Sequence, residues 1–427
     1  MSELDFAAIG IGPFHLSLAA LLEKEKSFKA LFFDLKKEFE WHSELMFADA
    51  DMQTSFMKDL VTPVDPTNAN SFLNYLVSND LFYSFMNTGR RTISRREFER
   101  YGRWVAQRLN SLRFSHRVES VRFDGSQFEV GTSQGTFRSK DICVGTGPVP
   151  RVPEVARNLL SDRVFHAKSE HLKNLRLDGL DVAIIGGGQT GIEVFRSCFS
   201  GLWGSARSVT LVSRRDNLEP LDESPFTNEY FAPGYVESFH HLPETQKRAI
   251  VAKQKLASDG NTPAYLQSLY NDLYRIKNVE DDRRPIRILP MRNLEYMAKR
   301  DSGYELQLAN RYASATEALF ADVVILCTGF ETRLPHAIEP LLNQLDLDET
   351  RLPKLEKNFR VKWNGPATNR IYAVNFGRYS HGIAEPQTSL MAWRSATIIN
   401  DLFGRTVYPV SPSRPSFLHY DRLEESF

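Results

Sequence analysis

The fold of this chain is decided by two stretches, FAAIGIGPFH at residues 6–15 and DVAIIGGGQTG at residues 181–191. Each begins with a short apolar run, passes through a glycine-rich turn and leads into a helical pattern of apolar residues. A continuous apolar run is typical of a strand buried on both faces of a parallel sheet. A strand, a glycine turn and a helix in succession open a βαβ unit. The sequence therefore predicts an α/β fold with two such units.

The first turn has the properties of a pyrophosphate-binding turn. Gly10 and Gly12 permit a tight turn and a close backbone approach, and the following helix offers free N–H groups and its positive dipole end. The sixth position of the motif is His15 instead of glycine. The next apolar run ends at Asp34, where an acidic residue accepts hydrogen bonds from a ribose. We interpret this region as a dinucleotide site, with an ordinary strand–turn–helix as the alternative.

The second turn carries the full motif, with Gly186, Gly188 and Gly191 directly after a strand. No acidic residue ends the following strand, which runs instead into Arg214 and Arg215. Two guanidinium groups at this place suit a 2′-phosphate, which a carboxylate would repel. This turn therefore favours NADP over NAD, and a solvated basic turn is the alternative.

Two dinucleotide turns in one chain indicate a flavin that receives hydride from a nicotinamide, with FAD at the first turn and NADPH at the second. Two further turns, CVGTG at residues 143–147 and CTGF at residues 327–330, each follow an apolar strand. Such turns commonly mark the crossings between two nucleotide-binding domains. Plain tight turns are the alternative.

These features predict two Rossmann-like domains with a small helical substrate-binding region. We expect a discontinuous FAD domain, residues 1–170 plus 330–427, and an NADPH domain at residues 176–325 with a helical insert at about residues 220–285. Within that insert, residues 243–280 have apolar positions at helical spacing, and we expect helices packed on the surface of the second domain.

Composition excludes several other classes of protein. The 427 residues contain 53 Lys plus Arg and 53 Asp plus Glu, a balance that argues against nucleic-acid or anionic-membrane binding. The three cysteines are far apart and form no CxxC pair, so we expect neither a disulfide framework nor a metal site. No apolar run approaches the ~20 residues of a membrane span. The first residues, MSELD, lack a cationic signal segment, and we expect a cytoplasmic protein.

Longer motifs make the chain resemble the flavin-dependent N-hydroxylating monooxygenases, the lysine, ornithine and diamine N-hydroxylases of hydroxamate siderophore pathways. The most specific motifs are MQTSFMKDLVT at residues 52–62 and HGIAEPQTSLMAWR at residues 381–394. The stretches SFLNYL at residues 71–76 and NEYF at residues 228–231 add to the resemblance. The segment SDG at residues 258–260 resembles the lysine and diamine branch more than the ornithine branch.

The resemblance implies that FAD is reduced by NADPH, that O2 adds at flavin C4a, and that the hydroperoxide hydroxylates a primary amine. The substrate would be L-lysine or an aliphatic diamine, cadaverine or putrescine, and relatives suggest a dimer or tetramer. The reaction needs a site closed to water and a neutral amine, because an ammonium has no lone pair. A free lysine amine with a pKa of ~10.4 is mostly charged at neutral pH, so deprotonation must be favoured.

The resemblance also implies roles for individual residues. Gln53 would lie beside the flavin ring as a catalytic residue, and Lys58 would bind the carboxylate of an amino-acid substrate. Asn228 and Ser389 would serve both catalysis and substrate binding, Asn228 at the backbone end and Ser389 at the amine end. The full set of expected cofactor-binding residues is Gly10, Gly12, Pro13, Phe14, Asp34, Trp41, His42, Gln53, Val118, Gly147, Gly186, Gly188, Gln189, Thr190, Gly191, Arg214, Arg215, Pro386, Gln387 and Thr388.

Structural explanations remain open for several of these residues. Lys58 could form a simple ion pair with the adjacent Asp59, and Trp41 and His42 could be core packing. Asn228 and Ser389 could be turn or cap residues, as such side chains often are.

Three other functions fit the sequence less well. A disulfide oxidoreductase needs a redox-active cysteine pair, which the spacing does not offer. A flavin-containing or Baeyer–Villiger monooxygenase carries a related linker, but residues 165–175 depart from its pattern at Ala167 and Leu175. A non-catalytic flavoprotein would have no need of the arginine pair at residues 214–215.

Overall fold

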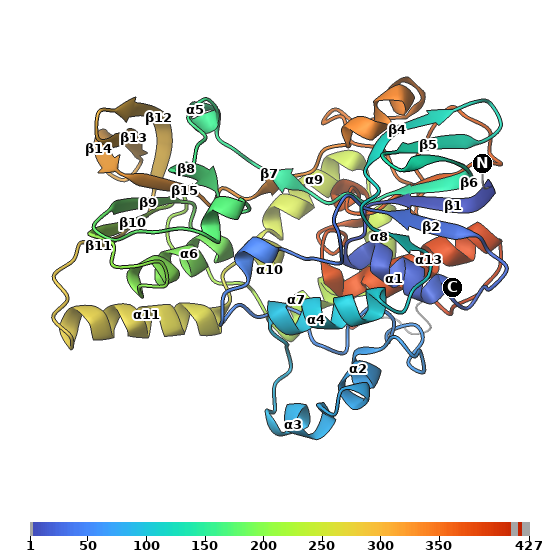
Figure 1. Cartoon of the computed structure of the whole chain (residues 1–427), viewed down its shortest axis with the longest axis horizontal. Coiled ribbons are helices and arrows are strands. Elements are labelled where there is room, and N and C mark those ends of the chain that lie inside the picture. Colours follow the sequence, from blue (N-terminus) through green and yellow to red (C-terminus); the bar gives the residue numbers. More distant parts are fainter. Residues whose placement is uncertain (1–2, 411–416, 421–427) are drawn as a thin grey trace, which may run out of the picture.

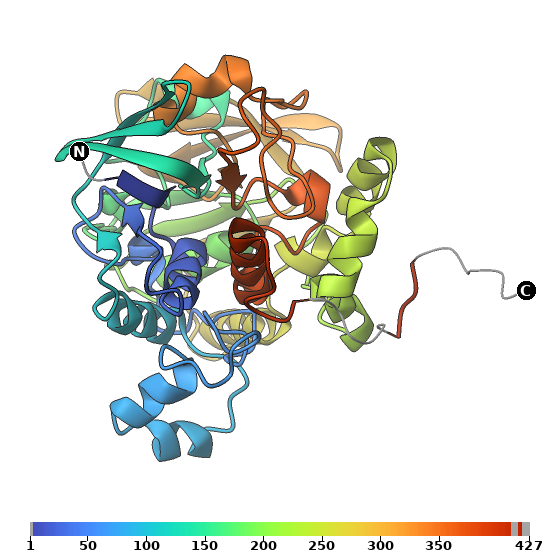
Figure 2. The same ribbon diagram turned by 90° about the vertical axis from the view of Figure 1, so that its right-hand side faces the viewer.

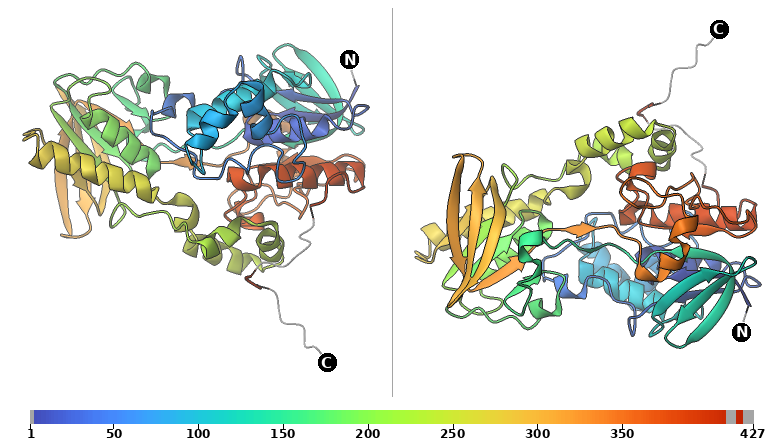
Figure 3. Two further views of the ribbon diagram at one scale, coloured as in Figure 1. Left: turned by 90° about the horizontal axis from the view of Figure 1, so that it is seen from below. Right: turned by 90° about the horizontal axis from the view of Figure 1, so that it is seen from above.

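The computed structural model describes residues 3–410 and 417–420. Its two largest sheets, each with its own covering helices, lie towards opposite ends of an elongated molecule (Figure 1, Figure 3). The expected α/β fold is confirmed. The residues 411–416 and 421–427 of the expected FAD domain lie outside the described residues. Among the described residues, no helix is both long and apolar enough to cross a bilayer.

The first sheet is mixed and has β1 (Glu3–Ile9) between two parallel neighbours, β2 (Ala30–Phe33) and β6 (Gly135–Val144). Its order is β3-β2-β1-β6-β5-β4, and β17 also pairs in parallel with β6. The strands β4, β5 and β6 form an antiparallel meander. The remaining bounds are β3 Leu112–Arg113, β4 Val118–Phe123, β5 Phe128–Thr132 and β17 Ile371–Ala373.

The second sheet is entirely parallel, in the order β11-β10-β9-β15-β8. The two predicted strands in it, β9 (Asp181–Ile185) and β15 (Val323–Leu326), are buried along nearly their whole length, as continuous apolar runs require. A three-stranded antiparallel sheet, β12-β13-β14, packs beside it. The other bounds are β8 Val164–His166, β10 Ser208–Val212, β11 Ile286–Leu289, β12 Arg292–Arg300, β13 Gly303–Asn310 and β14 Ala315–Ala321.

Two short strands join the halves. β7 (Val149–Pro150) pairs antiparallel with β16 (Phe330–Glu331), and Arg151 N–H donates to the Gly329 carbonyl at 3.0 Å. One chain crossing follows the turn at residues 143–147 and the other follows the turn at residues 327–330 (Figure 1). The interpretation of these two turns as crossings is confirmed.

The helices of the predicted insert are present, but they do not all cover the second sheet. α11 (Pro263–Asn278) packs on that sheet through Tyr265, Leu269 and Ile276. In contrast, α8 (Pro233–His240) and α9 (Glu244–Lys253) contact α12 (Arg378–His381) of the C-terminal segment. The expectation that residues 243–280 lie on the second domain is therefore correct for α11 and wrong for α9. The apolar side chains of α8 and α9 instead form a buried cluster with Ile383.

The first sheet is covered by α1 (Pro13–Leu22) and α13 (Met391–Phe403), which lie side by side (Figure 2), and by α4 (Arg95–Ala106). The helix α6 (Gln189–Phe199) covers the second sheet. The remaining helices are α2 Phe72–Ser78, α3 Phe82–Asn87, α5 Glu154–Arg157, α7 Pro225–Asn228 and α10 Leu256–Asp259, with 3-10 segments Ser43–Leu45, Glu170–Leu172, Glu229–Phe231, His336–Gln344 and Thr388–Leu390.

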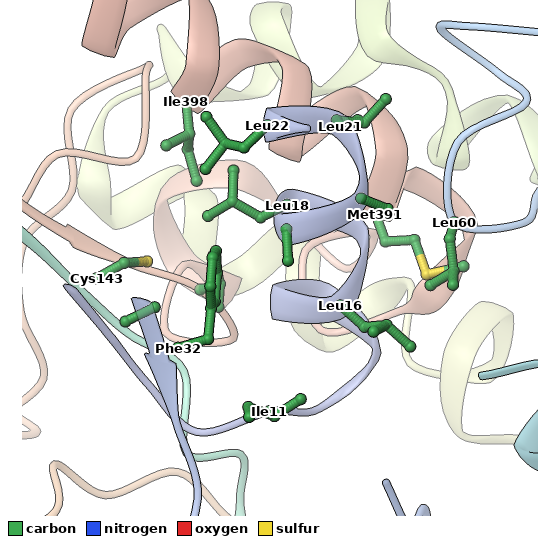
Figure 4. Packing of buried hydrophobic residues seen from close by; sticks show 14 of the residues in the cluster. Ile11, Leu16, Leu18, Leu21, Leu22, Phe32, Leu60, Cys143, Met391 and Ile398 are labelled. Atoms are coloured by element: carbon green, nitrogen blue, oxygen red, sulfur yellow. The ribbon is translucent and has the colours of Figure 1, made fainter. Parts of the chain in front are cut away.

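The helix α1 is apolar on nearly all sides and fully enclosed. Leu18 and Leu21 on α1 lie among Phe32 of β2 and Met391 and Ile398 of α13 (Figure 4). A helix buried all round is fixed in position by packing, since its surroundings leave little room for adjustment. The glycine turn that begins α1 is therefore held rigidly against the sheet.

Replacement of Leu18 by alanine tests this packing. Leu18 is 1% exposed, and its truncation leaves a cavity that should lower the free energy of unfolding by about 3 kcal/mol, measured by urea denaturation. The matched control is Leu35→Ala, because Leu35 is 65% exposed and should change stability by less than about 0.5 kcal/mol. Equal effects of the two substitutions would contradict the packing described here.

Candidate functional site

The first glycine turn lies at the carboxyl end of β1 and leaves the start of α1 open. Gly10 has φ +95°, and a Cβ there would lie 2.6 Å from the Gly145 carbonyl oxygen, so only glycine fits. Gly12 is the N-cap of α1, makes no side-chain cap and has no atom within 4 Å of the Cβ position. The first N–H groups of α1 are thus accessible from a space without a side chain. This cradle fits a pyrophosphate.

His15 explains why the sixth motif position is not glycine. Its Nδ1–H donates to the Gly10 carbonyl at 2.6 Å, and its Nε2 lies 3.1 Å from the Cys143 Sγ. Burial lowers the pKa of His15 to about 4, so the ring is neutral. His15 therefore holds the turn against β6, and the departure from the glycine motif does not weaken the site.

Asp34 ends β2 beside this turn, as predicted, and its carboxylate binds the turn itself. The Ile11 N–H donates to Oδ2 at 2.6 Å, and the Lys36 N–H donates to Oδ1 at 2.9 Å. Lys36 Nζ lies 3.6 Å from Oδ2. Asp34 thus fixes the conformation of the turn, and its contact with a ribose stays a prediction.

The second turn repeats the first at the carboxyl end of β9. Gly186 has φ +128°, and a side chain there would collide with the Cys327 carbonyl, while one at Gly191 would collide with the Gly186 carbonyl. Gly188 is the N-cap of α6, without a side-chain cap and with open space at its Cβ position. Gly186 and Gly191 allow close packing, and Gly188 leaves the start of α6 open, which again fits a pyrophosphate.

The two arginines after β10 have different surroundings. Arg214 is exposed, whereas Arg215 Nη2 donates to the Asp259 carbonyl at 2.9 Å and its Nη1 lies 3.3 Å from Glu219. Arg311, from the turn after β13, donates to the Arg214 carbonyl. Arg214 is therefore available to a ligand and Arg215 is engaged within the protein. The sequence offered no signal for Arg311, because its approach depends on the antiparallel sheet.

Thr262 connects the predicted flavin side to the second glycine turn. The Gln53 Nε2 lies 3.4 Å from the Thr262 Oγ1, and the Thr262 N–H donates to the Gln189 Oε1 at 2.9 Å. Thr262 is the N-cap of α11. The structure thus brings together Gln53 and Gln189, which are far apart in the sequence, through a residue that the motifs did not single out. The side-chain amide of Gln189 therefore makes hydrogen bonds within the protein through both its oxygen and its nitrogen.

Lys58 lies in a pocket between the Gln53 loop and the C-terminal segment. Burial lowers the pKa of Lys58, and the negative charge of Glu229 partly opposes that effect. The pocket is lined by Met52, Thr54, Ser55, Phe56, Lys58, Asp59, Phe72, Ile93, Phe98, Tyr101 and Thr388. A half-buried cation among mostly apolar side chains is a suitable partner for one carboxylate.

The alternative of a simple Lys58–Asp59 ion pair is wrong. The Asp59 carboxylate accepts hydrogen bonds from the Val61, Thr62 and Phe72 N–H groups at 2.6 to 2.9 Å, and from the Thr62 hydroxyl. No ion pair joins Asp59 to Lys58 in the described part of the chain. The Asp59 carboxylate thus binds backbone N–H groups of its own loop and of α2.

The C-terminal segment places Thr388 in the same pocket as Lys58, with Pro386 and Gln387 half-buried just before it. Ser389 is buried, and its hydroxyl has no hydrogen-bond partner among the residues that the structure describes. Buried hydroxyls normally have partners, so this one fits contact with a bound molecule. Arg394 supports the segment: it donates to the Glu385 carbonyl and lies 4.2 Å from the Phe14 ring.

Asn228 is not brought into the pocket. It ends α7, is exposed, and its Nδ2 donates to the Glu223 carbonyl at 3.3 Å. The structure thus gives Asn228 the helix-end position that was the alternative explanation, while its neighbour Glu229 acts electrostatically on Lys58. The substrate role of Asn228 stays a prediction.

Trp41 and His42 are packed at the junction of the two halves. The Trp41 ring lies 5.0 Å from Phe98 and 4.8 Å from His42. Burial, followed by the charges of Lys168 and Arg95, lowers the pKa of His42 to about 3, and its buried Nδ1 has no partner. Trp41 thus has the packing role, and His42 keeps one unpaired nitrogen.

The other expected cofactor residues lie on elements of both halves of the molecule. Val118 begins β4, half-buried and paired with Thr132. Gly147 has φ +74° and open space at its Cβ position, on the crossing after β6. Pro13 and Phe14 form the first turn of α1, and Thr190 the first turn of α6.

Comparisons with known proteins agree with this arrangement. The family model of L-lysine 6-monooxygenase/L-ornithine 5-monooxygenase matches residues 2–332. L-lysine N6-monooxygenase of Escherichia coli is 40% identical over 96% of both chains, and putrescine N-hydroxylase of Acinetobacter baumannii is 29% identical over 95% of this chain and 91% of its own.

Among solved structures, the FAD-bound cadaverine monooxygenase of the desferrioxamine pathway of Erwinia amylovora has a TM-score of 0.90 and 25% identity, with both chains fully covered. The resemblance recognised from the motifs is confirmed. The chain belongs to the L-lysine 6-monooxygenase/L-ornithine 5-monooxygenase family.

Proposed function

We propose that this protein is an FAD- and NADPH-dependent monooxygenase that uses O2 to hydroxylate the terminal primary amine of L-lysine. One observation carries the proposal: Thr262 joins Gln189 at the second glycine turn to Gln53, whose chain neighbours Met52 and Thr54 line the pocket of Lys58. Membership of the family, and a relative named L-lysine N6-monooxygenase at 40% identity, support the same activity. The aliphatic diamines cadaverine and putrescine are the alternative substrates.

The residues present fit both cofactors. FAD would bind at Gly10 and Gly12, and NADPH at Gly186 and Gly188, because each pair opens an uncapped helix start. When bound, the two would supply hydride transfer to the flavin and an activated oxygen atom for the amine. Arg214 would bind the 2′-phosphate, since its guanidinium is exposed at the end of β10.

The chain's own residues would bind and orient the substrate. Lys58 would pair with the α-carboxylate, which directs the far amine of the substrate towards Gln53 and the flavin side. The unpartnered Ser389 hydroxyl would meet the reacting end, where a neutral amine can accept a hydrogen bond. The apolar pocket walls would exclude water and favour the neutral form of that amine.

Lys58 favours lysine over a diamine. A diamine would bring a second ammonium towards the Lys58 cation, and like charges repel at short range, whereas the lysine carboxylate attracts it. The putrescine N-hydroxylase relative is 29% identical, against 40% for the L-lysine N6-monooxygenase, which supports the amino acid.

The domain bounds, the assembly and the cellular setting are part of the same proposal. We place the FAD domain at residues 1–170 plus 330–427 and the NADPH domain at residues 176–325, with part of the helical insert docked on the C-terminal segment. We further propose a homo-oligomeric, cytoplasmic enzyme of hydroxamate siderophore biosynthesis, in keeping with the rhizobactin siderophore biosynthesis protein among its relatives.

Formation of a hydroxylamine tests the function. Purified FAD-loaded protein should form N6-hydroxylysine with NADPH and O2, and should act on cadaverine, putrescine and ornithine with a kcat/KM at least about tenfold lower. Products are identified by mass spectrometry, and NADPH oxidation is followed in parallel. A diamine preference would replace lysine by the alternative, and oxidation of a sulfide or ketone without any hydroxylamine would overturn the proposal.

Replacement of Lys58 by alanine should raise the KM for lysine by about 30-fold, because a charge-assisted contact to the carboxylate is lost. The rate of flavin reduction by NADPH should stay within about twofold, and the KM for cadaverine should not rise. The control is Lys140→Ala, an exposed lysine on β6 away from the pocket. An unchanged KM for lysine in the Lys58 variant would exclude its binding role.

Replacement of Arg214 by alanine should reduce the preference for NADPH over NADH by about tenfold or more, with little effect on the KM for lysine. The comparison variant is Arg215→Ala, whose guanidinium contacts Asp259 and Glu219 and should affect stability more than coenzyme choice. The ratio of kcat/KM values for the two coenzymes is measured by stopped-flow flavin reduction. A preserved ratio in the Arg214 variant would refute the assignment.

A further inference from the structure

A fully buried carboxylate lies just inside the helix that begins at the second glycine turn. Glu193 is on α6, four residues after Gln189, and has 0% exposure. At a rise of about 1.5 Å per residue it lies roughly 6 Å along the axis from the helix start. Its Oε1 accepts a hydrogen bond from the Gln189 Nε2 at 2.8 Å. A negative charge is thus coupled directly to the turn where NADP phosphates would bind.

Such a charge works against an anionic ligand unless it is neutralised. The open start of α6 attracts phosphates through free N–H groups and its dipole, whereas a buried carboxylate nearby repels them with little screening by solvent. Burial raises the pKa of the Glu193 carboxyl and the charge of Asp49 raises it further, so the ionised form is costly here without a cation. The second turn therefore requires a compensating cation.

That cation comes from the other half of the molecule. Arg95, on α4 beside the first sheet, donates from Nη1 and Nη2 to the two Glu193 oxygens at 2.9 Å each. Arg95 is held in place, because its N–H donates to the Ala50 carbonyl at 2.8 Å and its Nη1 to the Leu45 carbonyl at 3.2 Å. The bidentate pair is mostly buried, with side-chain exposures of 15% and 0%.

We propose that Arg95 is a positioning residue for the nicotinamide coenzyme, and that it acts through Glu193. By neutralising Glu193 it removes the repulsion of the phosphates and leaves the Glu193 carboxylate to orient Gln189 at the turn. The inference rests on the proposed function, since it takes NADP as the ligand of α6.

Coupling between the two halves follows from this arrangement. The affinity for NADP depends on an arginine that contacts Glu193 only when α4 is docked against α6. By thermodynamic reciprocity, bound NADP then favours the docked arrangement of the two halves. Coenzyme binding and assembly of the site between the two sheets are thereby linked.

Calorimetric titration of the oxidised, FAD-loaded protein with NADP+ at about pH 8.5, far above the ordinary pKa of a glutamate, tests the proposal. Arg95→Met should weaken NADP+ binding by about tenfold to thirtyfold, as one uncompensated charge roughly 8 Å from a phosphate would at an effective dielectric constant of about 20. Arg95→Met/Glu193→Gln should recover most of the affinity, because the double variant lacks the charge as well as its partner. Arg95→Lys should bind nearly as wild type.

The matched control is Arg96→Met, which removes the adjacent guanidinium. Arg96 is exposed and contacts the Met46 carbonyl, and its loss should change the dissociation constant by less than about twofold. FAD content, melting temperature and the KM for lysine verify that each variant is folded. A variant that loses FAD is replaced in the comparison by Arg95→Lys/Glu193→Gln, which should bind NADP+ at least as tightly as Arg95→Lys.

The outcomes separate this inference from the proposed function. Wild-type protein that fails to bind NADP+ at all contradicts the proposed function. Wild-type protein that binds NADP+, with Arg95→Met binding equally well or the double variant as weak as the single one, overturns only the role of Arg95.

Discussion

Both dinucleotide sites depend on one constraint: α1 and α6 each begin at a glycine that has no side chain to cap the helix. The first N–H groups of a helix lack partners within it and must be satisfied from outside. In both turns a glycine with positive φ presses the backbone against the next parallel strand, at Gly145 in one case and Cys327 in the other. This contact explains which strand lies beside β1 and which beside β9, because each turn needs that strand next to it.

Polar contacts hold the two halves of the molecule together. Thr262 contacts both glutamines, one from each half, and Arg95 and Glu193 form a buried ion pair across the junction. Removing one member of such a pair leaves an uncompensated buried charge, so the pair favours one relative arrangement. Lys58 and Thr388 then close the adjoining pocket from the side of the first sheet.

Much of the fold was predictable from the sequence, because its signals are local. The glycine turns, the buried strands around residues 6–10 and 181–186, and the crossings near residues 147 and 329 each depend on a few consecutive residues. Side-chain destinations were less predictable. Arg214 and Arg215 are adjacent and chemically identical, yet one is exposed and the other is bound to Asp259. The sequence of α9 has the pattern of a surface helix, but that pattern does not indicate which part of the protein the helix packs against.

The sequence by itself determined the α/β class, the two glycine turns, the place of Asp34 at a strand end and the membership suggested by the long motifs, because these reflect backbone conformation and short-range chemistry. Only the tertiary structure decided that Asp34 binds the Ile11 N–H, that Asp59 binds the Phe72 N–H, and that Arg95 meets Glu193. Those contacts join residues far apart along the chain. Their partners are chosen by the placement of α4 relative to α6 and of loops relative to sheets, which no local pattern records.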